Sequence, residues 1–478
     1  MNGVDTHHSD FDRLSGRWKK CRDFADGQSA VRAAGEVYLA KNGAEESDAY
    51  KARVGRSDLY NATWVTLKTL LGMMFRKDPT IDLPASVEPH IEDIDMAGTS
   101  LATFARKVAL DALRIGRLGI MVDHPVRNNV EAISVAVAEQ QGLRPSLQFY
   151  RAECIINWST RRVGNRTVLS LVVLKEQAEE RKNEFEAKPV DQWRVLDLTE
   201  AGLYRQRVFQ KATDGTGSFV QIGEDTFPLM NNKAMNFIPF YIVGTDGVNV
   251  DVDEPPLIDL VDANEAHYQV NSDLRTTLHF GVPTFCISGM NQDPDASPIV
   301  VGSRAAILLA DPQAKAYFAE PSGPMVPQMR DTLKDLEGRM AMLGARMLQE
   351  EKRGVEAAET AAIKRQGEDA SLADIALSIS DAMEKALGVF CEWAGTPYKV
   401  VYQLNRDYNP AGLGPAQLTA LLKAVQSGEM SSQSFFAILQ RNDVVDPELT
   451  YEEEQERIGS QGPVRPSLAP PDNGVAAA

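Results

Sequence analysis

Two long stretches of helical sequence constrain this chain more than any other feature. The first covers residues 256–279, beginning at the Pro255-Pro256 pair, and the second covers residues 328–352. At a rise of 1.5 Å per residue, each helix would be about 36 Å long. The residues between them, 280–327, are mostly β-like. Two helices of matched length around such an insert predict a rod that presents the insert at its tip, which is an architectural feature and not a catalytic one.

The first quarter of the chain is expected to be helical. Ser47 and Asp48 can cap a helix that runs to about Met74. Ser100 can cap a second helix, which Gly116 would stop because glycine tolerates the left-handed conformation that often ends helices.

From residue 118 to residue 243 the pattern changes to short β-rich runs with turn residues between them. Most gaps are too short for crossover helices, so a largely antiparallel meander or sandwich, packed on the N-terminal helices, is expected. The fold class is therefore predicted to be α+β. The expected strands cover residues 118–123, 146–150, 154–158, 166–174, 192–198, 202–210, 218–223 and 237–243.

The insert and the C-terminal part complete the predicted organisation. Within the insert, strands are expected at 282–288, 299–301, 305–310 and 315–320. After the second long helix, residues 353–370 are expected to form a loop, Ser371 to cap a helix to about Trp393, and residues 398–404 to form a strand. Residues 461–478 are rich in Pro, Gly and Ala and are expected to be disordered. Three shorter helices are expected at 417–425, 433–440 and 447–458.

Composition narrows the class of protein. No apolar run approaches the roughly 18 residues that span a membrane, and the first residues do not resemble a signal peptide, so synthesis in the cytoplasm and no membrane contact are expected. The four cysteines form no CxxC pair, which predicts reduced thiols and no structural metal. The net charge of −17 argues against a surface that grips nucleic acid all over. A channel through which DNA slides is consistent with the same charge.

The sequence offers little catalytic chemistry. It contains no Gly-x4-Gly-Lys-Ser/Thr, which excludes a P-loop ATPase, and no cofactor is expected. Asp123 and His124 at the end of an expected strand could act as an acid–base pair. Pro125 follows at once and no nucleophile elbow is evident, so the chain is expected not to be an enzyme. A hydrolase that uses Asp123 and His124 is kept as an alternative.

Two further sets of residues are candidates for a role. Apolar residues recur three and four positions apart along the second long helix, so they should form a buried seam between the two helices. Cations bracket the acidic segment after that helix, either as a solvent-exposed loop of mixed charge or as transient contacts to a phosphate backbone. The seam residues are Leu333, Leu336, Met340, Leu343 and Met347, and the cations are Lys352, Arg353, Lys364 and Arg365.

Several separated segments, in one order, resemble the tailed-bacteriophage portal protein (head-to-tail connector) family. Each segment alone is only moderately specific, but their order and spacing together are specific, and the resemblance covers roughly residues 30–460. The segments are PPLIDLVDANEAHYQVNSD (255–273), AKAYFAEPSG (314–323) leading into LKDLEGRMAMLGARML (333–348), ETAAIKRQGEDASLADIA (359–376) and GEMSSQSFFAILQRNDVVDPELTYEEEQERI (428–458).

The resemblance implies a portal-type fold with a helical and β-rich wing, two long stem helices, a small β-containing clip and a helical crown. The cations named above would then lie at a DNA channel. By position, the wing would be 1–255 together with part of 371–404 (a long helix and a returning strand), the stem 256–279 and 328–352, the clip 280–327, the tunnel loop 353–370 and the crown 405–460.

The resemblance also implies a function. Portal proteins form a homo-oligomeric ring, usually dodecameric, at one capsid vertex of the virion, through which double-stranded DNA is packaged and later ejected. The implied partners are the terminase large subunit, a head-tail adaptor and the major capsid or scaffold protein. Twelve copies of a chain with charge −17 would present a negative wall along which DNA could slide. Another virion connector or head-completion protein is the alternative from the same class.

Overall fold

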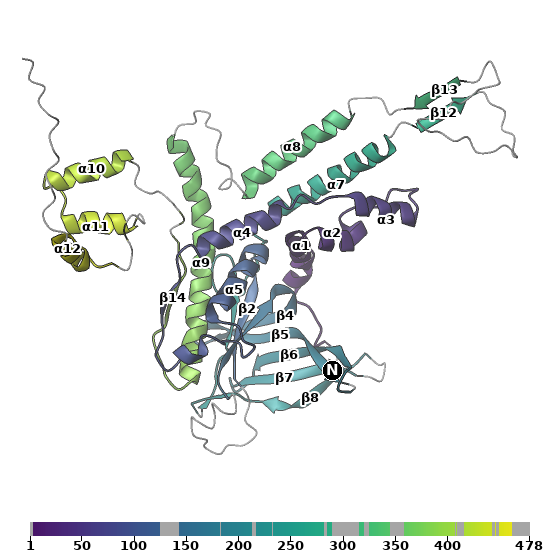
Figure 1. Cartoon of the computed structure of the whole chain (residues 1–478). Helices are drawn as coiled ribbons and strands as arrows, with labels where there is room; N and C mark the ends of the chain where they lie inside the picture. Colours follow the sequence, from purple (N-terminus) through teal and green to yellow (C-terminus); the bar gives the residue numbers. More distant parts are fainter. Residues whose placement is uncertain are drawn as a thin grey trace, which may run out of the picture. The chain divides into compact units, whose positions relative to one another are not determined.

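The computed structural model of the chain divides into two compact units, Met1–Arg406 and Asp407–Ala478. Helices occur in both units and antiparallel sheets in the first (Figure 1), which confirms the expected α+β class. The structure describes residues 3–124, 143–181, 183–212, 217–231, 233–281, 284–288, 315–319, 325–344, 358–406, 408, 415–441, 445 and 449–460.

The first quarter of the chain is helical, as expected. The Ser100 hydroxyl accepts a hydrogen bond from the Thr103 backbone N–H at the start of α5, and Gly116 ends this helix with φ of 77°. Both ends were predicted from these residue types. The helices are α1 (Ser9–Asp26), α2 (Gln28–Ala34), α3 (Ser47–Arg56), α4 (Ala62–Met74) and α5 (Leu101–Ile115), with 3₁₀ turns η1 (Gly35–Val37) and η2 (Glu88–His90).

The prediction of a single helix from Ser47 to about Met74 is wrong, because the chain leaves the helix between Arg56 and Ala62. At this break, two backbone N–H groups donate to side chains from other elements and not to carbonyls one turn earlier. The Asp58 N–H donates to Asn271, and the Leu59 N–H donates to Gln28. Tertiary hydrogen bonds therefore override the local helical pattern.

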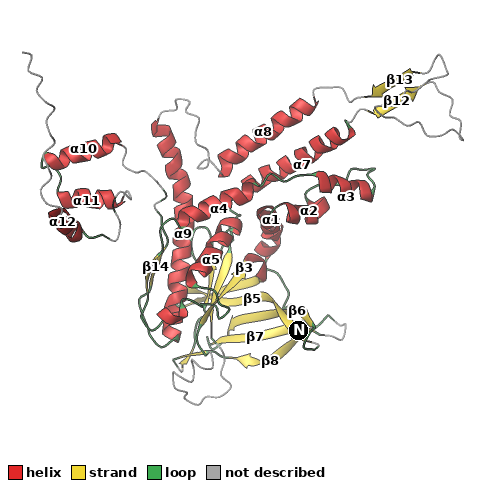
Figure 2. Cartoon of the chain, viewed as in Figure 1, coloured by secondary structure: helices red, strands yellow, loops and turns green. Residues whose placement is uncertain are grey.

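The β-rich region forms two main sheets. Five strands follow one another in the order β4-β5-β6-β7-β8, all antiparallel, which confirms the expected meander (Figure 2). A separate three-stranded sheet has the order β11-β2-β3. The strands are β2 (Leu118–Asp123), β3 (Ser146–Arg151), β4 (Ile155–Val163), β5 (Arg166–Arg181), β6 (Ala187–Leu198), β7 (Tyr204–Lys211), β8 (Phe219–Thr226) and β11 (Phe240–Val243). The 3₁₀ turn η3 (Ala152–Cys154) precedes β4, and β9 (Leu229–Met230) and β10 (Lys233–Ala234) form a short hairpin.

The long helix α9 (Ala358–Trp393) packs on α5 and on the three-stranded sheet (Figure 1). Its side chains at Ile379, Met383, Leu387 and Phe390 have no exposed surface, and their spacing of three and four residues defines one buried stripe. After α9, the short strand β14 (Val401–Gln403) pairs with β1 (Thr80–Asp82), which joins the end of this unit to its first hundred residues.

The prediction of a loop over 353–370 is wrong from Ala358 onward, because α9 begins there and runs through Ser371 without a break. The segment is rich in Ala, Glu, Lys, Arg and Gln, which are good helix formers, and it contains no proline. One glycine, Gly367, costs only about 1 kcal/mol in a helix interior. Residues 353–357 lie outside the described part of the chain.

The second unit contains the three short helices that were expected. Its last helix begins later than predicted, because Thr450 and Glu453 form a capping box. The Glu453 N–H donates to the Thr450 hydroxyl, and the Thr450 N–H donates to the Glu453 carboxylate. The helices are α10 (Pro415–Gln426), α11 (Ser432–Arg441) and α12 (Tyr451–Ser460). Residues 461–478, expected to be disordered, lie outside the described residues.

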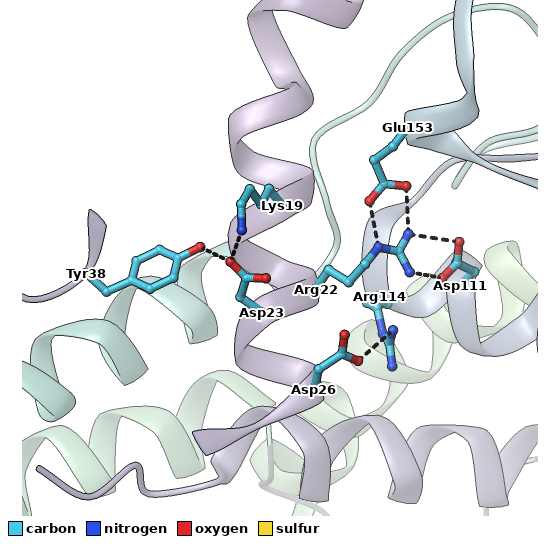
Figure 3. A network of polar contacts seen from close by, with 8 residues as sticks. All are labelled: Lys19, Arg22, Asp23, Asp26, Tyr38, Asp111, Arg114 and Glu153. Carbon is cyan, nitrogen blue, oxygen red and sulfur yellow. Dashed lines mark hydrogen bonds and ion pairs between the residues drawn. The ribbon is translucent and has the colours of Figure 1, made fainter. Parts of the chain in front are cut away.

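A buried arginine ties α1 to α5 and to the start of the five-stranded sheet (Figure 3). The Arg22 guanidinium donates to both oxygens of Asp111 in α5, at 2.8 and 3.2 Å. It also donates to both oxygens of Glu153 in η3, at 2.6 and 2.8 Å. The Arg22 and Asp111 side chains are only 12% and 8% exposed. Such a pair of two-pronged contacts, one to buried Asp111 and one to partly exposed Glu153, depends on the planar geometry of arginine.

We expect Arg22→Met to lower the free energy of unfolding by about 3–5 kcal/mol, because it leaves Asp111 buried without its charge partner. The matched control is Arg13→Met, which removes the exposed ion pair with Asp10 and should change stability by at most about 1 kcal/mol. Chemical denaturation of both variants measures the difference. Equal losses would show that the Arg22 network does not hold α1 in place.

Candidate functional site

The candidate site is a pair of antiparallel helices with a β-hairpin between their far ends. Helix α7 (Ile258–Phe280) and helix α8 (Met325–Gly344) run side by side (Figure 1). The chain between them includes β12 (Thr284–Ser288), which pairs with β13 (Lys315–Ala319). Both long helices, and strands within 282–288 and 315–320, were expected from the sequence. The strands expected at 299–301 and 305–310 lie outside the described residues.

The two helices share a small apolar core. Met340 of α8 is 1% exposed and clusters with Leu260 and Ala263 of α7. Leu333 is also buried, and Leu336 is half-buried. Three of the five predicted seam residues are therefore buried or half-buried in α8.

The end of α8 departs from the predicted seam. Leu343 is 41% exposed, and Met347 lies outside the described residues. The contact passes instead through the next residue, Gly344, which approaches Leu260 of α7 and Thr66 of α4. Because successive residues of a helix point about 100° apart, a contact through Gly344 turns Leu343 away from the pair.

At Gly344, α8 lies close to both α7 and α4. A Cβ atom added at this position would lie 2.7 Å from Leu260 Cδ2 and 2.9 Å from Thr66 Cγ2. Both distances are shorter than a carbon–carbon contact, whose optimum is about 3.5–4.0 Å. The absence of a side chain thus lets α8 approach α4 and α7 this closely.

We expect Gly344→Ala to destabilise the first unit by about 1–3 kcal/mol, because the added methyl group overpacks this contact. Gly338→Ala in the same helix is the control. An added Cβ there has no neighbour within 4 Å, so the change should be neutral or stabilising by up to about 1 kcal/mol. Thermal denaturation of the two variants compares them. A stabilised Gly344→Ala protein would contradict the close packing.

Amide side chains of α7 bind the break between α3 and α4. Asn264 has no exposed surface, its Oδ1 accepts from the Thr63 hydroxyl at 3.0 Å, and its Nδ2 donates to the Tyr60 carbonyl at 2.7 Å. Two turns further along α7, Asn271 Oδ1 accepts from the Asp58 N–H at 3.1 Å. Neither residue was predicted from the sequence to make these contacts. The sequence pattern that could have identified them is two asparagines seven positions apart in a predicted helix, a spacing that places both on one face.

Charged and polar groups attach α7 to α1 and to the segment after α2. Lys20 of α1 forms ion pairs with Asp262, at 2.6 Å, and with Glu265. Burial lowers the pKa of Lys20, but the hydrogen bonds to the two carboxylates outweigh burial, so the pKa is raised and Lys20 stays charged. Gln269 Nε2 donates to the Tyr38 carbonyl at 3.0 Å. Helix α7 is therefore held along much of its length by the N-terminal helices.

His267 faces α8 from the middle of α7. Its side chain is 5% exposed, and its Nε2 lies 3.5 Å from Glu337 Oε1 of α8. Nδ1 has no hydrogen-bond partner among the described residues. Burial lowers the pKa of His267, and the nearby Glu337 carboxylate opposes this only in part. The folded chain thus favours the neutral imidazole.

Because the folded chain binds this proton less readily than the unfolded chain, His267 should reduce stability as the pH falls below about 6.5, the ordinary histidine pKa. We expect His267→Met, which does not titrate, to shrink the loss of stability between pH 7 and pH 5. His7→Met, at a side chain that is 41% exposed, serves as the control and should leave that loss unchanged. Denaturation curves recorded across this pH range measure the loss of stability in each variant. If His267→Met loses as much stability as the original chain, His267 is not the group that destabilises the fold at low pH.

The candidate acid–base pair has structural contacts. Asp123, at the end of β2, accepts a hydrogen bond from Gln206 Nε2 at 3.3 Å and lies 4.0 Å from the Arg194 guanidinium. The His124 ring stacks on Trp393 of α9, with 5.4 Å between the ring centroids. These contacts join β2 to the five-stranded sheet and to α9, and they give both side chains a role in packing.

The candidate channel cations are only partly within the described residues. Lys352 and Arg353 lie outside them, and Lys364 and Arg365 belong to the helical backbone of α9. No group of three or more His, Cys, Asp or Glu side chains that could hold a metal ion occurs in the part of the chain that the structure describes. Within the same residues, every helix is too short or too polar to cross a lipid bilayer.

Comparison with known proteins gives one match to a protein-family model and several solved structures with low structural similarity to the chain. A family described as "Domain of unknown function (DUF4055)" matches residues 256–394, which span α7 to α9. No curated protein matches the chain.

Three solved structures each share 10% identity with the chain and are matched over 98% of their own length. The first is a chain in the neck of an empty gene transfer agent (GTA) particle computed with C6 symmetry, with a TM-score of 0.37 over 86% of this chain. The second is a chain in the virion of a native GTA particle, with a TM-score of 0.38 over 85% of this chain. The third is a chain in the neck of a native GTA particle computed with C12 symmetry, with a TM-score of 0.39 over 85% of this chain. With TM-scores below 0.5, these likenesses carry no argument about the chain.

Proposed function

We propose that this chain is the subunit of a portal-type ring at a capsid vertex, through which double-stranded DNA is packaged and ejected. The observation that carries the proposal is the unit formed by α7, the β12–β13 hairpin and α8. It has the form expected of a portal stem with a clip, and it is encoded by segments that resemble the portal family in sequence.

The contacts of this unit give a physical reason for the resemblance. Segment 255–273 supplies Asn264, His267 and Asn271, which attach α7 to α4, α8 and the α3–α4 break. Segment 333–348 supplies Met340 and Gly344, at which α8 packs on α7. Within these segments, Asn264 and Asn271 thus fix α7 to the N-terminal helices, and His267, Met340 and Gly344 fix α8 to α7. A pair held in this way could keep a constant position beside a channel while DNA moves.

The negative charge of the chain favours free passage of DNA through the ring over tight DNA binding. Copies of a subunit with charge −17 arranged around a channel would repel the DNA backbone and disfavour tight adsorption. Lys352, Arg353, Lys364 and Arg365 are the proposed cations that position the backbone at the narrowest point. Two of them, Lys364 and Arg365, would be carried on the N-terminal part of α9 and not on a loop.

In this proposal the protein is not an enzyme, and the work of packaging comes from a partner. The sequence has no phosphate-binding loop, so a terminase large subunit would supply ATP hydrolysis and dock at the β12–β13 end of the helix pair. A head-tail adaptor and the major capsid or scaffold protein would bind elsewhere on the ring.

The purified chain should form closed rings with a central hole in negative-stain micrographs, and native mass spectrometry should give one main assembly of about twelve copies. Closed rings require two different patches on each subunit, so assembly should be cyclic and heterologous. Monomers or dimers alone, across concentrations and salts, would overturn the proposal. A small open assembly without a channel would instead favour a head-completion protein.

The same preparation tests the role in DNA passage. Neutralising Lys352, Arg353, Lys364 and Arg365 together should leave ring assembly intact but change DNA packaging or retention in particles. The control neutralises four exposed cations of the wing region, Arg13, Lys41, Lys51 and Lys211, and should change neither. Unchanged packaging and retention in the first variant would show that these cations do not engage DNA.

A further inference from the structure

Arg117, just after α5, is a buried cation that lacks a carboxylate partner among the described residues. Its side chain has no exposed surface, and its Nε and Nη2 atoms have no hydrogen-bond partner there. Burial lowers the pKa of Arg117 to about 10, and the charges of Asp10, Asp253 and Asp251 oppose this only in part. The guanidinium is therefore charged at neutral pH. A buried charge without an ion pair costs stability, so its contacts must account for its place in the fold.

Arg117 contacts the backbone of the segment that leads into α7. Its Nη1 atom donates to the Val250 carbonyl at 3.3 Å and to the Asp251 carbonyl at 2.9 Å. The guanidinium carbon lies 4.1 Å from the centre of the Trp158 ring in β4. The side chain thus links the five-stranded sheet to residues 244–256, which we call the α7 leader.

The α7 leader contains no helix or strand, although the structure describes all of its residues. Its internal hydrogen bonds are local. The Gly244 N–H donates to the Gly247 carbonyl at 2.8 Å, and the Asp251 N–H donates to Asn249 Oδ1 at 3.0 Å. Such bonds would persist if the leader moved as a whole. Its position therefore depends on what other elements contact it.

The end of the leader also meets α5, at the residue next to Arg117. A Cβ atom added to Gly116 would lie 3.1 Å from Pro256 Cδ and 3.3 Å from the Glu254 carbonyl oxygen. Two adjacent residues, Gly116 and Arg117, thus hold the end and the middle of the leader. Helix α7 begins at Ile258, two residues further on.

We infer that Arg117 is a positioning residue, which fixes the α7 leader and the start of α7 and lowers the stability of the fold in doing so. The planar guanidinium donates in fixed directions, so its two carbonyl contacts define one position of the leader. An apolar side chain of similar size would avoid burying a charge but could not hold the leader. In a ring, a fixed start of α7 gives every subunit the same stem direction, and this last step rests on the proposed function.

Arg117→Met separates position from stability. Methionine adapts to irregular space and its thioether makes favourable contacts with aromatic rings, so it suits the place beside Trp158. We expect the midpoint of chemical denaturation to stay the same or to rise, because no charge is buried. Amide hydrogen exchange in residues 244–252 should nevertheless become at least about tenfold faster, because the leader has lost its carbonyl contacts.

Arg117→Lys tests rescue by a conservative change. Lysine keeps a buried cation that can donate to the same carbonyls, so exchange in the leader should return toward the original rate. The denaturation midpoint should not exceed that of the original chain. The control is Arg114→Met, which removes another buried arginine at the end of α5, one that pairs with Asp26. It should leave exchange in the leader unchanged.

Exchange in Arg117→Met at the original rate would overturn the inference, because the leader would then keep its position without Arg117. A variant that fails to fold, or that loses both stability and order in the leader, would overturn it as well. Arg117 would in that case be a support of the whole fold.

Ring assembly is a separate measurement. Freedom at the start of α7 should broaden the range of copy numbers that native mass spectrometry finds in rings of Arg117→Met. A loosened leader in rings of one unchanged copy number would disprove the link to the stem. If the original chain forms no rings, the proposed function fails, and the exchange measurement still decides whether Arg117 positions the leader.

Discussion

The hydrogen bonds of Asn264 fix the relation between the helix pair and the rest of the first unit. This side chain is completely buried, so its amide must be satisfied inside the protein, and both of its partners belong to the segment where α3 ends and α4 begins. Thr63 lies in the first turn of α4 and Tyr60 just before it, and the Tyr60 carbonyl accepts from both Asn264 and the Ala62 N–H. The break in the N-terminal helices and the position of α7 therefore depend on each other.

The packing of α8 on α7 follows from this placement. Once α7 lies against α4, the third helix, α8, can approach both only where it lacks a side chain, and Gly344 supplies that point. Met340 then fills the space beside Leu260, one turn earlier in α8. A buried amide at Asn264 and a glycine contact at Leu260, one turn apart on the same face of α7, thus define the geometry of the candidate stem.

The sequence predicted those elements whose cause is local. Ser100 and Gly116 bound α5 as caps, and short β-rich runs with close turns gave the meander. Features that depend on contacts between residues far apart in the sequence were not predicted. The break after Arg56 depends on Asn271, more than 200 residues away, and the seam turns away from Leu343 because of Thr66 in another helix. The start of α9 at Ala358 has a local cause, because the residues that follow it are mostly good helix formers.

The pairing of β1 with β14 has a consequence for synthesis of the chain. Thr80 pairs with Gln403, so β1 leaves the ribosome long before its partner exists. At roughly 5–20 residues per second, the strand waits on the order of tens of seconds. During that time it is an open edge, and edges are where nascent chains join wrongly. Strand β1 has only three residues, so it offers other nascent chains little backbone with which to pair. Its edge is covered when β14, the last strand of the unit, leaves the ribosome.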